Sequence, residues 1–390
     1  MSKTLSYVLV TPYTVAKSRT GGVLSRLLSR TDLELVGAQI FTPDKDFADM
    51  YAASLKERAP QNQLVLLADY VKSYFGPSGG RPHRTLLLLF KGENPCGQLL
   101  NVCGHLYTQH VEVDALAGET IRDTYADLIF DANNPDEVRY FEPAVLTPRH
   151  QDEANNDLRF FANFLDGQEN LVQNVKYPDP SKIERTLVII KPDNWKHNSS
   201  RPGTIIDMFS RTGLRIIGIK VHRFSLAQAL DFYGPVEAIL KKKLAPTFGL
   251  KAKEILERAF SFPLSKELTE TLGADFGTEC AKDQFHQIVE FMSGKRPGQT
   301  SGDDINKPGD VKCMILVYEG ENAVNKIRDV LGPTDPLQAP EGTVRREFGS
   351  NVMVNTAHAS DSSESYEREQ NIVQISKNSI VSIIREHTGN

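Results

Sequence analysis

"YVLVTPYTVAKSRTGGVLSRLLSRTDLELVGAQIF" (7–41) and "LVIIKPDNWKHNSSRPGTIIDMFSRTGLRIIGIKV" (187–221) align along their whole length. Each begins with an apolar strand that ends at a Pro. A loop, a helix that closes at Arg-Thr and a second apolar strand follow. Self-similarity of this kind indicates a duplicated structural unit. The chain therefore contains two copies of one module, each opening with β-α-β.

Two further pairs of segments extend the repeat. "RTLLLLFKGENPCGQLLNVCG" (84–104) matches "VKCMILVYEGENAVNKIRDVLG" (311–332). "ETIRDTYADLIFDANNPDE" (119–137) matches "GTVRREFGSNVMVNTAHASDSSE" (342–364) when one residue is skipped in the first copy. Each copy then reads β-α-β, one or two helices, and β-α-β. This order predicts an α+β protein with two ferredoxin-like (βαββαβ) modules, each an antiparallel four-stranded sheet with helices packed on it.

The repeat also predicts where the modules lie. Residues 1–146 form the first module, 147–182 a linker and 183–390 the second module. The linker is polar and interrupted by Pro, and "LRFFANFL" within it suggests an amphipathic helix that packs on one of the modules. The second module carries inserts at about 241–283, with helical periodicity, and about 295–310, which resembles a polar loop.

Composition limits the classes of function. The 390 residues carry a formal charge of −5, which gives no reason to expect nucleic acid or an anionic membrane as a partner. No apolar run approaches the roughly 18 residues of a membrane span, and the first residues do not resemble a signal peptide. The four cysteines form no Cys-x-x-Cys pair. We therefore expect free thiols in a reducing compartment, and a cytoplasmic protein.

The familiar phosphate and metal motifs are missing from the sequence. It contains no GxxxxGK[ST] loop, no GxGxxG opening a helix and no HExxH. A dispersed polar set remains in the second copy: Lys191, Arg328, Thr334, Arg345, Asn355, His358 and Glu369. Taken singly, each has an ordinary structural interpretation, such as a solvated helical Arg or a strand-end Lys.

Taken in order, these residues resemble a known family. "RTLVIIKPD", "VLGPTDP…PEGTVRREFG" and "NTAHASDSSESYERE" are similar to nucleoside diphosphate kinases. The family motif is Asn-x-x-His-Gly-Ser-Asp, with a Glu eleven residues after the His. Asn355, His358, Ser360, Asp361 and Glu369 keep that spacing. The resemblance implies transfer of the γ-phosphate of a nucleoside triphosphate such as ATP to a nucleoside diphosphate, by a ping-pong mechanism through a phosphohistidine at His358.

The resemblance also implies a role for each residue. His358 would be the nucleophile, Glu369 would fix the tautomer of its ring, and Lys191 would act both in catalysis and in phosphate binding. The nucleotide-binding residues would be Lys191, Tyr233, Arg328, Thr334, Arg345, Asn355 and Phe285.

Partners and metal follow from the same resemblance. Nucleoside tri- and diphosphates would be the substrates, and family members commonly form homo-oligomers. Mg²⁺ would be held mainly by the nucleotide phosphates. Asp361 would either reach the metal through water or cap the following helix with Ser360, and the sequence leaves both roles open.

The first copy lacks the corresponding residues. Thr11 replaces Lys191, Leu100 replaces Arg328, Leu106 replaces Thr334, and Asn134 aligns with His358; only Arg122 matches, at Arg345. We expect this copy to be degenerate and structural.

The second copy also departs from the family pattern. Gln284 occupies the position of the base-stacking Phe, beside Phe285, and Asn194 and Ala359 each replace a Gly. The degenerate copy and the inserts keep one alternative open, a nucleotide-binding scaffold or regulatory module with little turnover. Transfer of the phosphoryl group from His358 to a protein partner would use the same intermediate and also stays open.

Overall fold

The computed structural model describes residues 3–58, 62–104, 106, 118–134 and 137–389. Its two four-stranded antiparallel sheets share one topology, β2-β3-β1-β6 in the first module and β8-β9-β7-β10 in the second. The fold class predicted from the repeat is therefore confirmed.

The first sheet consists of β1 (Thr4–Val10), β2 (Glu34–Phe41), β3 (Thr85–Gly92) and β6 (Val145–Leu146). The remaining elements of this half are α1 (Pro12–Ala16), α2 (Thr20–Ser29), α3 (Lys45–Glu57), α4 (Asn62–Tyr74), α5 (Pro95–Cys103), α6 (Ile121–Tyr125), β4 (Asp127–Phe130), β5 (Val138–Glu142) and α7 (Gln151–Leu165). Strand β1 is central because its run of apolar residues is buried on both faces, with Val8 opposite Leu88 of β3.

The second sheet consists of β7 (Ile183–Ile190), β8 (Arg215–His222), β9 (Cys313–Glu321) and β10 (Ala357–Ala359). Its helices are α8 (Arg201–Ser210), α9 (Leu226–Phe260), α10 (Lys266–Leu272), α11 (Thr278–Ser293), α12 (Ala323–Leu331), α13 (Val344–Phe348), α14 (Ser363–Val373) and α15 (Ile380–Thr388). Short 3₁₀ turns lie at Pro180–Lys182, Pro192–Asn194, Gly302–Ile305 and Pro336–Gln338, and a π-helical turn at Gly273–Gly277. β7 is the central strand here, with Val188 opposite Leu316 of β9.

The segment predicted as a linker contains a helix of the first module. Helix α7 lies within residues 147–182 and buries Leu158, Phe161 and Leu165 in the core cluster that also contains Tyr7 of β1. These apolar residues recur at helical spacing, so the expected amphipathic helix is present and packs on the first sheet. Because β6 and α7 follow one another as β10 and α14 do, α7 is the counterpart of α14.

The last helix of the chain packs on the first module rather than on the second. Ile380, Val381 and Ile384 of α15 belong to the same core cluster as Tyr7 and Phe161. Asn378, just before α15, donates to Leu165 O at 2.9 Å. Residues at both ends of the sequence therefore share one core, although residues 183–390 were expected to form a separate module.

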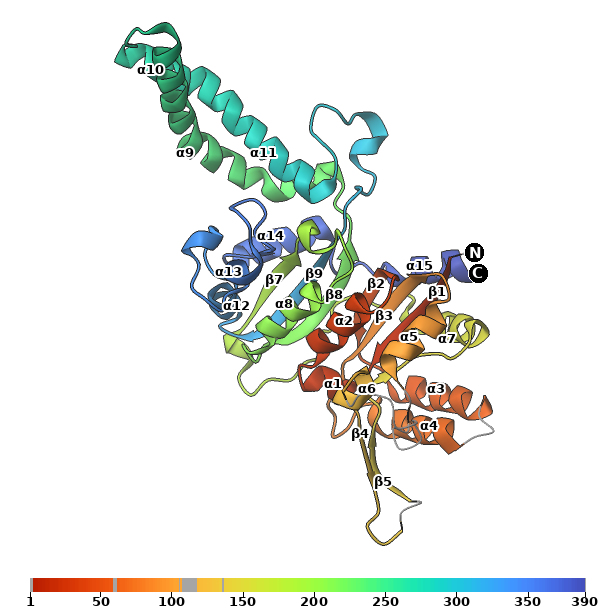
Figure 1. Cartoon of the computed structure of the whole chain (residues 1–390). Helices are drawn as coiled ribbons and strands as arrows, with labels where there is room; N and C mark the ends of the chain where they lie inside the picture. The colour runs from red at the N-terminus through yellow and green to blue at the C-terminus, as the bar shows by residue number, and fades with distance from the viewer. Residues whose placement is uncertain (1–2, 59–61, 105, 107–117, 135–136, 390) are drawn as a thin grey trace. The chain divides into compact units, whose positions relative to one another are not determined.

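Helices α2 and α8 join the two modules and lie side by side in Figure 1. A Cβ added to Gly21 would lie 2.5 Å from Gly203 O, and a Cβ added to Gly203 would lie 2.3 Å from Gly21 O. Any side chain at either position would force the backbones apart. Ser25 Oγ adds a bond to Ser200 O at 3.0 Å. The modules thus form one compact unit, comprising residues 1–221, 314–370 and 374–390.

The second compact unit, residues 222–313 with 371–373, is a helical hairpin. α9 and α11 form its two long arms, and α10 connects them (Figure 1). Ser225 begins α9 with a capping box to Gln228. A Cβ added to Gly277 would lie 2.1 Å from Ala245 O, so the arms touch through their backbones there. The helical insert predicted at about 241–283 lies in this hairpin.

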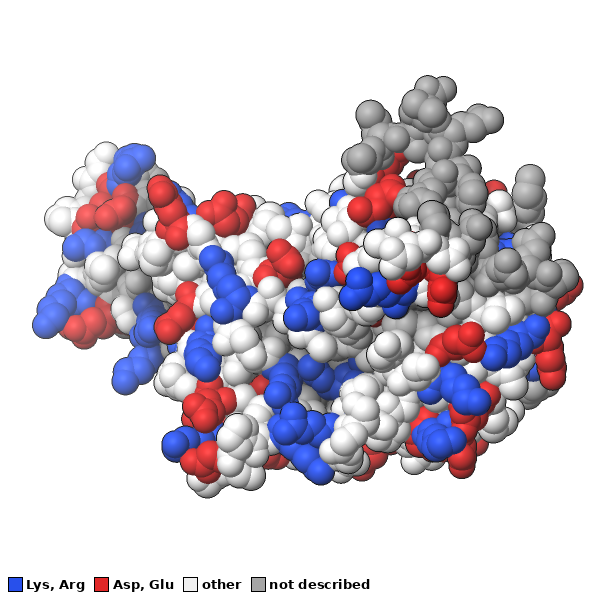
Figure 2. All heavy atoms as spheres, turned by 90° about the horizontal axis from the view of Figure 1, so that it is seen from below, with Lys and Arg blue, Asp and Glu red and all other residues white. Residues whose placement is uncertain are grey.

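Charged side chains of both signs are interspersed over the face shown in Figure 2. Among the described helices, none is both long enough and apolar enough to cross a membrane.

Candidate active site

Lys191 lies directly after β7 and is only 8% exposed. Its Nζ donates to Asn355 Oδ1 at 2.6 Å. Burial, and secondarily the positive charge of Arg345, lower the pKa of Lys191 to about 7. The carboxylate of Asp193 acts in the opposite direction. Lys191 therefore changes charge near neutral pH, and a bound anion would favour its charged form.

Asn355 is buried, and both the oxygen and the nitrogen of its side-chain amide form hydrogen bonds. Its Oδ1 accepts from Lys191, and its Nδ2 donates to Thr334 O at 3.1 Å and Val352 O at 2.8 Å. Three segments far apart in the sequence thus meet at one side chain: the end of β7, the loop after α12 and the turn before β10. The expected proximity of Lys191, Thr334 and Asn355 is present, through the backbone of Thr334 rather than its hydroxyl.

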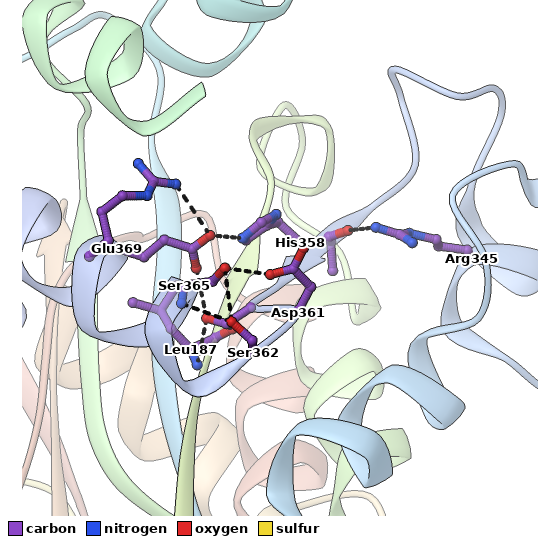
Figure 3. Close-up of polar contacts among 10 residues, drawn as sticks. Leu187, Arg345, His358, Asp361, Ser362, Ser365 and Glu369 are labelled. Atoms are coloured by element: carbon purple, nitrogen blue, oxygen red, sulfur yellow. Dashed lines mark hydrogen bonds and ion pairs between the residues drawn. The ribbon is translucent and has the colours of Figure 1, made fainter. Parts of the chain in front are cut away.

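His358 is the middle residue of β10, opposite Ile189 of β7. Its Nε2 lies 2.9 Å from Oε1 of Glu369, which projects from α14 and is 4% exposed (Figure 3). A carboxylate can only accept, so Nε2 carries the proton and the lone pair of the neutral ring lies on Nδ1. Glu369 thereby selects the tautomer and orients the ring.

Ser360 supports that pair. It lies two residues after His358 in the strand direction, and its Oγ donates to Glu369 Oε2 at 2.7 Å while accepting from Leu187 N at 3.3 Å. Both carboxylate oxygens of Glu369 are therefore engaged, which holds the side chain in one rotamer. This contact was predictable from the sequence. Ser360 directly follows β10 and continues its direction, and residues two apart in an extended segment, such as His358 and Ser360, point to the same face.

Arg345 of α13 braces the strand that carries His358. It donates to Gly332 O and to Ala357 O, each at 3.0 Å. Figure 3 shows His358 between Glu369 and Arg345. In the first module, Arg122 donates to the corresponding carbonyls of Gly104 and Val145. Arg122 is present although the first module lacks the histidine, so its role is structural. Arg345 makes the equivalent bonds and has the same structural role.

Asp361 and Ser360 do not cap the helix after His358. Ser362 is the N-cap of α14, accepting from Ser365 N at 3.1 Å, while Asp361 bonds the hydroxyl of Ser365. That bond, with a smaller effect from the charge of Arg328, lowers the pKa of Asp361. Arg328, on α12, is exposed. Asp361 is thus an ionised carboxylate near His358 and Arg328.

Asn194 is a further site residue, which sequence reasoning noted only as a departure from the family Gly. Its Nδ2 donates to Thr356 O at 2.8 Å and to Lys191 O at 3.0 Å, and its side chain is buried. Thr356 has φ 76°, a strained conformation for a β-branched residue. Asn194 therefore clamps the strained turn between Asn355 and His358 to the end of β7.

The first module has the same strand geometry without the nucleophile. Leu146 of β6 pairs with Leu9 as His358 pairs with Ile189, and Ala144, with φ 61°, corresponds to Thr356. Leu146, rather than Asn134, is therefore the counterpart of His358. The alignment was wrong because the β4–β5 hairpin precedes β6, and Asn134 lies between its two strands.

The position of Glu369 is also filled in the first module. Asp157 follows Leu146 by eleven residues, as Glu369 follows His358. Asp157 accepts from Tyr7 Oη at 2.6 Å and from Arg58 Nη1 at 2.8 Å. The buried carboxylate is thus kept, but a tyrosine and an arginine take the place of the histidine.

The remaining predicted residues belong to the second compact unit. Tyr233 on α9 and Phe285 on α11 are both buried, and their assignment to the nucleotide site stays a prediction. Within the described part of the chain, no group of three or more His, Cys, Asp or Glu residues could hold a metal ion. The role of Asp361 toward Mg²⁺ stays a prediction.

Known proteins are similar to the second module. A family profile described as nucleoside diphosphate kinase matches residues 184–243 and 276–378, omitting 244–275 within the helical hairpin. The nucleoside diphosphate kinase of Bdellovibrio bacteriovorus is 32% identical over 187 residues, which is 48% of this chain and 89% of that protein.

Another sequence relative and a solved structure are also similar to this chain. The nucleoside diphosphate kinase of Paracoccus denitrificans is 32% identical over 187 residues, covering 48% of this chain and 90% of its own length. A solved NDP kinase structure from Pyrobaculum aerophilum is 27% identical, with 50% of this chain and 100% of that chain covered and a TM-score of 0.35. Because these sequence relatives are matched over almost their whole length, the chain belongs to the nucleoside diphosphate kinase family.

Proposed function

We propose that this chain is a nucleoside diphosphate kinase that transfers the γ-phosphate of ATP to a nucleoside diphosphate through a phosphohistidine at His358. The observation that carries the proposal is the 2.9 Å contact between His358 Nε2 and Glu369 Oε1. It leaves the lone pair on Nδ1, the atom that would attack phosphorus.

The first half-reaction forms the phosphoenzyme. The Nδ1 lone pair forms a bond to the γ-phosphorus while the bond to the bridging oxygen breaks, and the nucleoside diphosphate departs with that electron pair. The ring becomes positively charged and keeps its proton on Nε2, beside Glu369. A carboxylate at that position stabilises the developing charge, as in other carboxylate–histidine pairs.

The second half-reaction reverses these steps. A terminal phosphate oxygen of an incoming nucleoside diphosphate attacks phosphorus, the N–P bond breaks, and His358 regains its lone pair. No proton needs to leave Nε2 in either direction. One nucleotide site then serves donor and acceptor in turn, which is the ping-pong order.

Lys191, Arg328 and Arg345 would offset the charge of the triphosphate, with Thr334 and Asn355 beside them. A charge-assisted hydrogen bond contributes about 1.5–3 kcal/mol. Mg²⁺ would be held mainly by the nucleotide phosphates and would neutralise part of their charge, and Asp361 would reach it through water. The assignments of Tyr233 and Phe285, the structural role of the first module, a homo-oligomer and a cytoplasmic location belong to the same proposal.

The test is labelling with γ-³²P-ATP and Mg²⁺, followed by a chase with GDP. We expect a label that is stable in alkali, labile in acid and transferred to GDP. His358→Asn should abolish the label while ATP binding persists. His197→Asn, at an exposed histidine of the same module, is the matched control and should label normally.

Two results would contradict the proposal. Label that persists in His358→Asn would remove that residue as the nucleophile. A folded wild-type protein that binds ATP but never becomes labelled would favour the nucleotide-binding scaffold instead.

A further inference from the structure

A cavity of about 640 Å³ lies in the first compact unit where the two modules meet. Its walls come from the first module, including Tyr13, Tyr70 and Arg84, and from the second, including Arg215 and Tyr318. The site residues Lys191, Asn355, His358 and Glu369 are not among its lining residues. Its volume falls within the range of small-molecule sites, roughly 300–1,000 Å³.

Two arginines approach one another in this cavity. Arg84 donates to Ile216 O at 2.5 Å, and Arg215 donates to Lys176 O at 3.1 Å with its guanidinium 4.6 Å from the centre of the Tyr177 ring. Burial, and next the charge of Arg215, lower the pKa of Arg84 to about 10. The two cations are therefore close enough to repel each other.

Acidic residues offset the charge of this pair only in part, through Glu319. Among the described residues, neither Arg84 nor Arg215 forms an ion pair with a carboxylate, and nearby Glu319 is paired with Arg185 at 2.7 Å. Like charges in a partly buried cavity are unfavourable unless an anion joins them. A phosphate is the natural partner because an arginine can donate two parallel hydrogen bonds to it.

The acidic residue in the wall is already engaged. Glu142 accepts from Thr11 Oγ1 at 2.7 Å, from Ala144 N at 3.0 Å and from the hydroxyl of Tyr70. These neutral donors satisfy its carboxylate oxygens, so Glu142 is committed to the wall rather than to the arginines. The cavity keeps a net positive charge from Arg84 and Arg215.

The wall also offers flat apolar surfaces. Tyr13, Tyr70, Tyr74 and Tyr140 line the cavity, and the rings of Tyr70 and Tyr74 lie 5.0 Å apart. Tyr74 is 49% exposed, so its ring is accessible. Aromatic side chains are the usual surface on which a nucleobase stacks.

We propose that this cavity binds a mononucleotide at a site separate from His358, with its phosphate on Arg84 and Arg215 and its base against the tyrosines. Both modules contribute to the site, so the degenerate first copy supplies one wall of it. The site exists independently of phosphoryl transfer at His358, and its occupancy can be measured without turnover.

Titration calorimetry of the full chain with AMP tests the proposal. Arg84→Gln and Arg215→Gln should each weaken AMP binding at least tenfold, because each removes a cation from the phosphate. Thermal unfolding of both variants controls for loss of the Arg84 bond to Ile216 O, because that bond joins the two modules. Arg139→Gln is the matched control, because Arg139 is exposed and is not among the residues that line the cavity. It should leave the affinity unchanged.

The base is tested with Tyr74→Ala, which should weaken AMP binding but not the binding of inorganic phosphate. Phosphate transfer from ATP to GDP should remain at the wild-type rate in both arginine variants, which separates this site from His358. Equal AMP affinity in the wild type and in Arg84→Gln and Arg215→Gln, or no AMP binding by folded wild-type protein, would overturn the proposal. Phosphate that binds as tightly as AMP would also overturn it, by reducing the cavity to an anion site.

Discussion

Raising the pH from about 7 to about 9 should weaken the binding of Mg²⁺–ADP, because Lys191 loses its positive charge over this range. Its pKa is lowered to about 7 by burial and by Arg345. Protonated Lys191 would donate to a phosphate of bound ADP, whereas neutral Lys191 would gain no charge–charge attraction. The affinity for ADP should therefore be highest below the pKa that Lys191 has in the unliganded protein, and it should fall as the pH rises above that pKa.

The size of the effect follows from the charged fraction of Lys191. About half of the side chains are charged at pH 7 and about one in a hundred at pH 9. A bound phosphate raises the pKa of Lys191, so the complex keeps the proton. The apparent affinity should therefore fall about 50-fold, which is about 2.3 kcal/mol. The terminal phosphate of ADP, with a second pKa near 6, keeps its charge throughout.

Titration calorimetry in buffers of different ionisation enthalpy measures both the affinity and the proton uptake. Uptake should rise from about half a proton per ADP at pH 7 to about one at pH 9. Lys191→Met should bind ADP more weakly near pH 6 and show no slope from pH 7 to 9. Lys196→Met, at an exposed lysine nearby, should keep the wild-type slope. A wild-type affinity that is constant over this range would refute the reasoning.

Three further predictions test the contact of Glu369 with His358, the hydrogen bonds of Asn194 and the ion pair of Arg58 with Asp157. Glu369→Ala should slow phosphorylation of His358 by on the order of 10²–10⁴, measured by rapid-quench labelling, because the tautomer is no longer held. An unchanged rate would show that the carboxylate does not act through the ring. Asn194→Gly removes two buried hydrogen bonds and should lower the free energy of unfolding in urea by about 1–2 kcal/mol. An unchanged midpoint would argue against the clamp. Arg58→Ala should cost about 2–3 kcal/mol by leaving Asp157 without its cation, and adding Asp157→Asn should recover part of that loss. If the double variant is less stable than Arg58→Ala, the charge of Asp157 is not the cause.

A comparison of the two copies distinguishes the residues that maintain the fold from those that would take part in catalysis. Arg122 and Arg345 make equivalent bonds to backbone carbonyls, and Ala144 and Thr356 adopt the same left-handed turn. These features accompany the fourth strand in both modules. At the fourth strand, the second copy has a histidine with an accepting carboxylate, whereas the first copy has Leu146 at that position.

The repeat and the resemblance made much of this protein predictable from its sequence. Strand and helix periodicity are local properties, so the four-stranded antiparallel sheets followed from the order of the elements. The fixed spacing of eleven residues between His358 and Glu369 identified both partners, because a short strand followed by a helix returns the carboxylate to the ring. The helix in "LRFFANFL" was also visible as a local pattern.

Contacts between distant segments were decided only by the tertiary structure. The correspondence between Leu146 and His358 could not be found by aligning the two copies, because the first copy contains the additional β4–β5 hairpin. The pairing of β6 with β1 shows which residues correspond. The clamp of Asn194 on Thr356 and the placement of α15 against Tyr7 depend on which surfaces meet after folding. The cavity between the modules depends likewise on the close approach of α2 and α8 at Gly21 and Gly203. Sequence patterns record what each segment prefers along the chain, whereas packing and strand register depend on partners that lie far away in it.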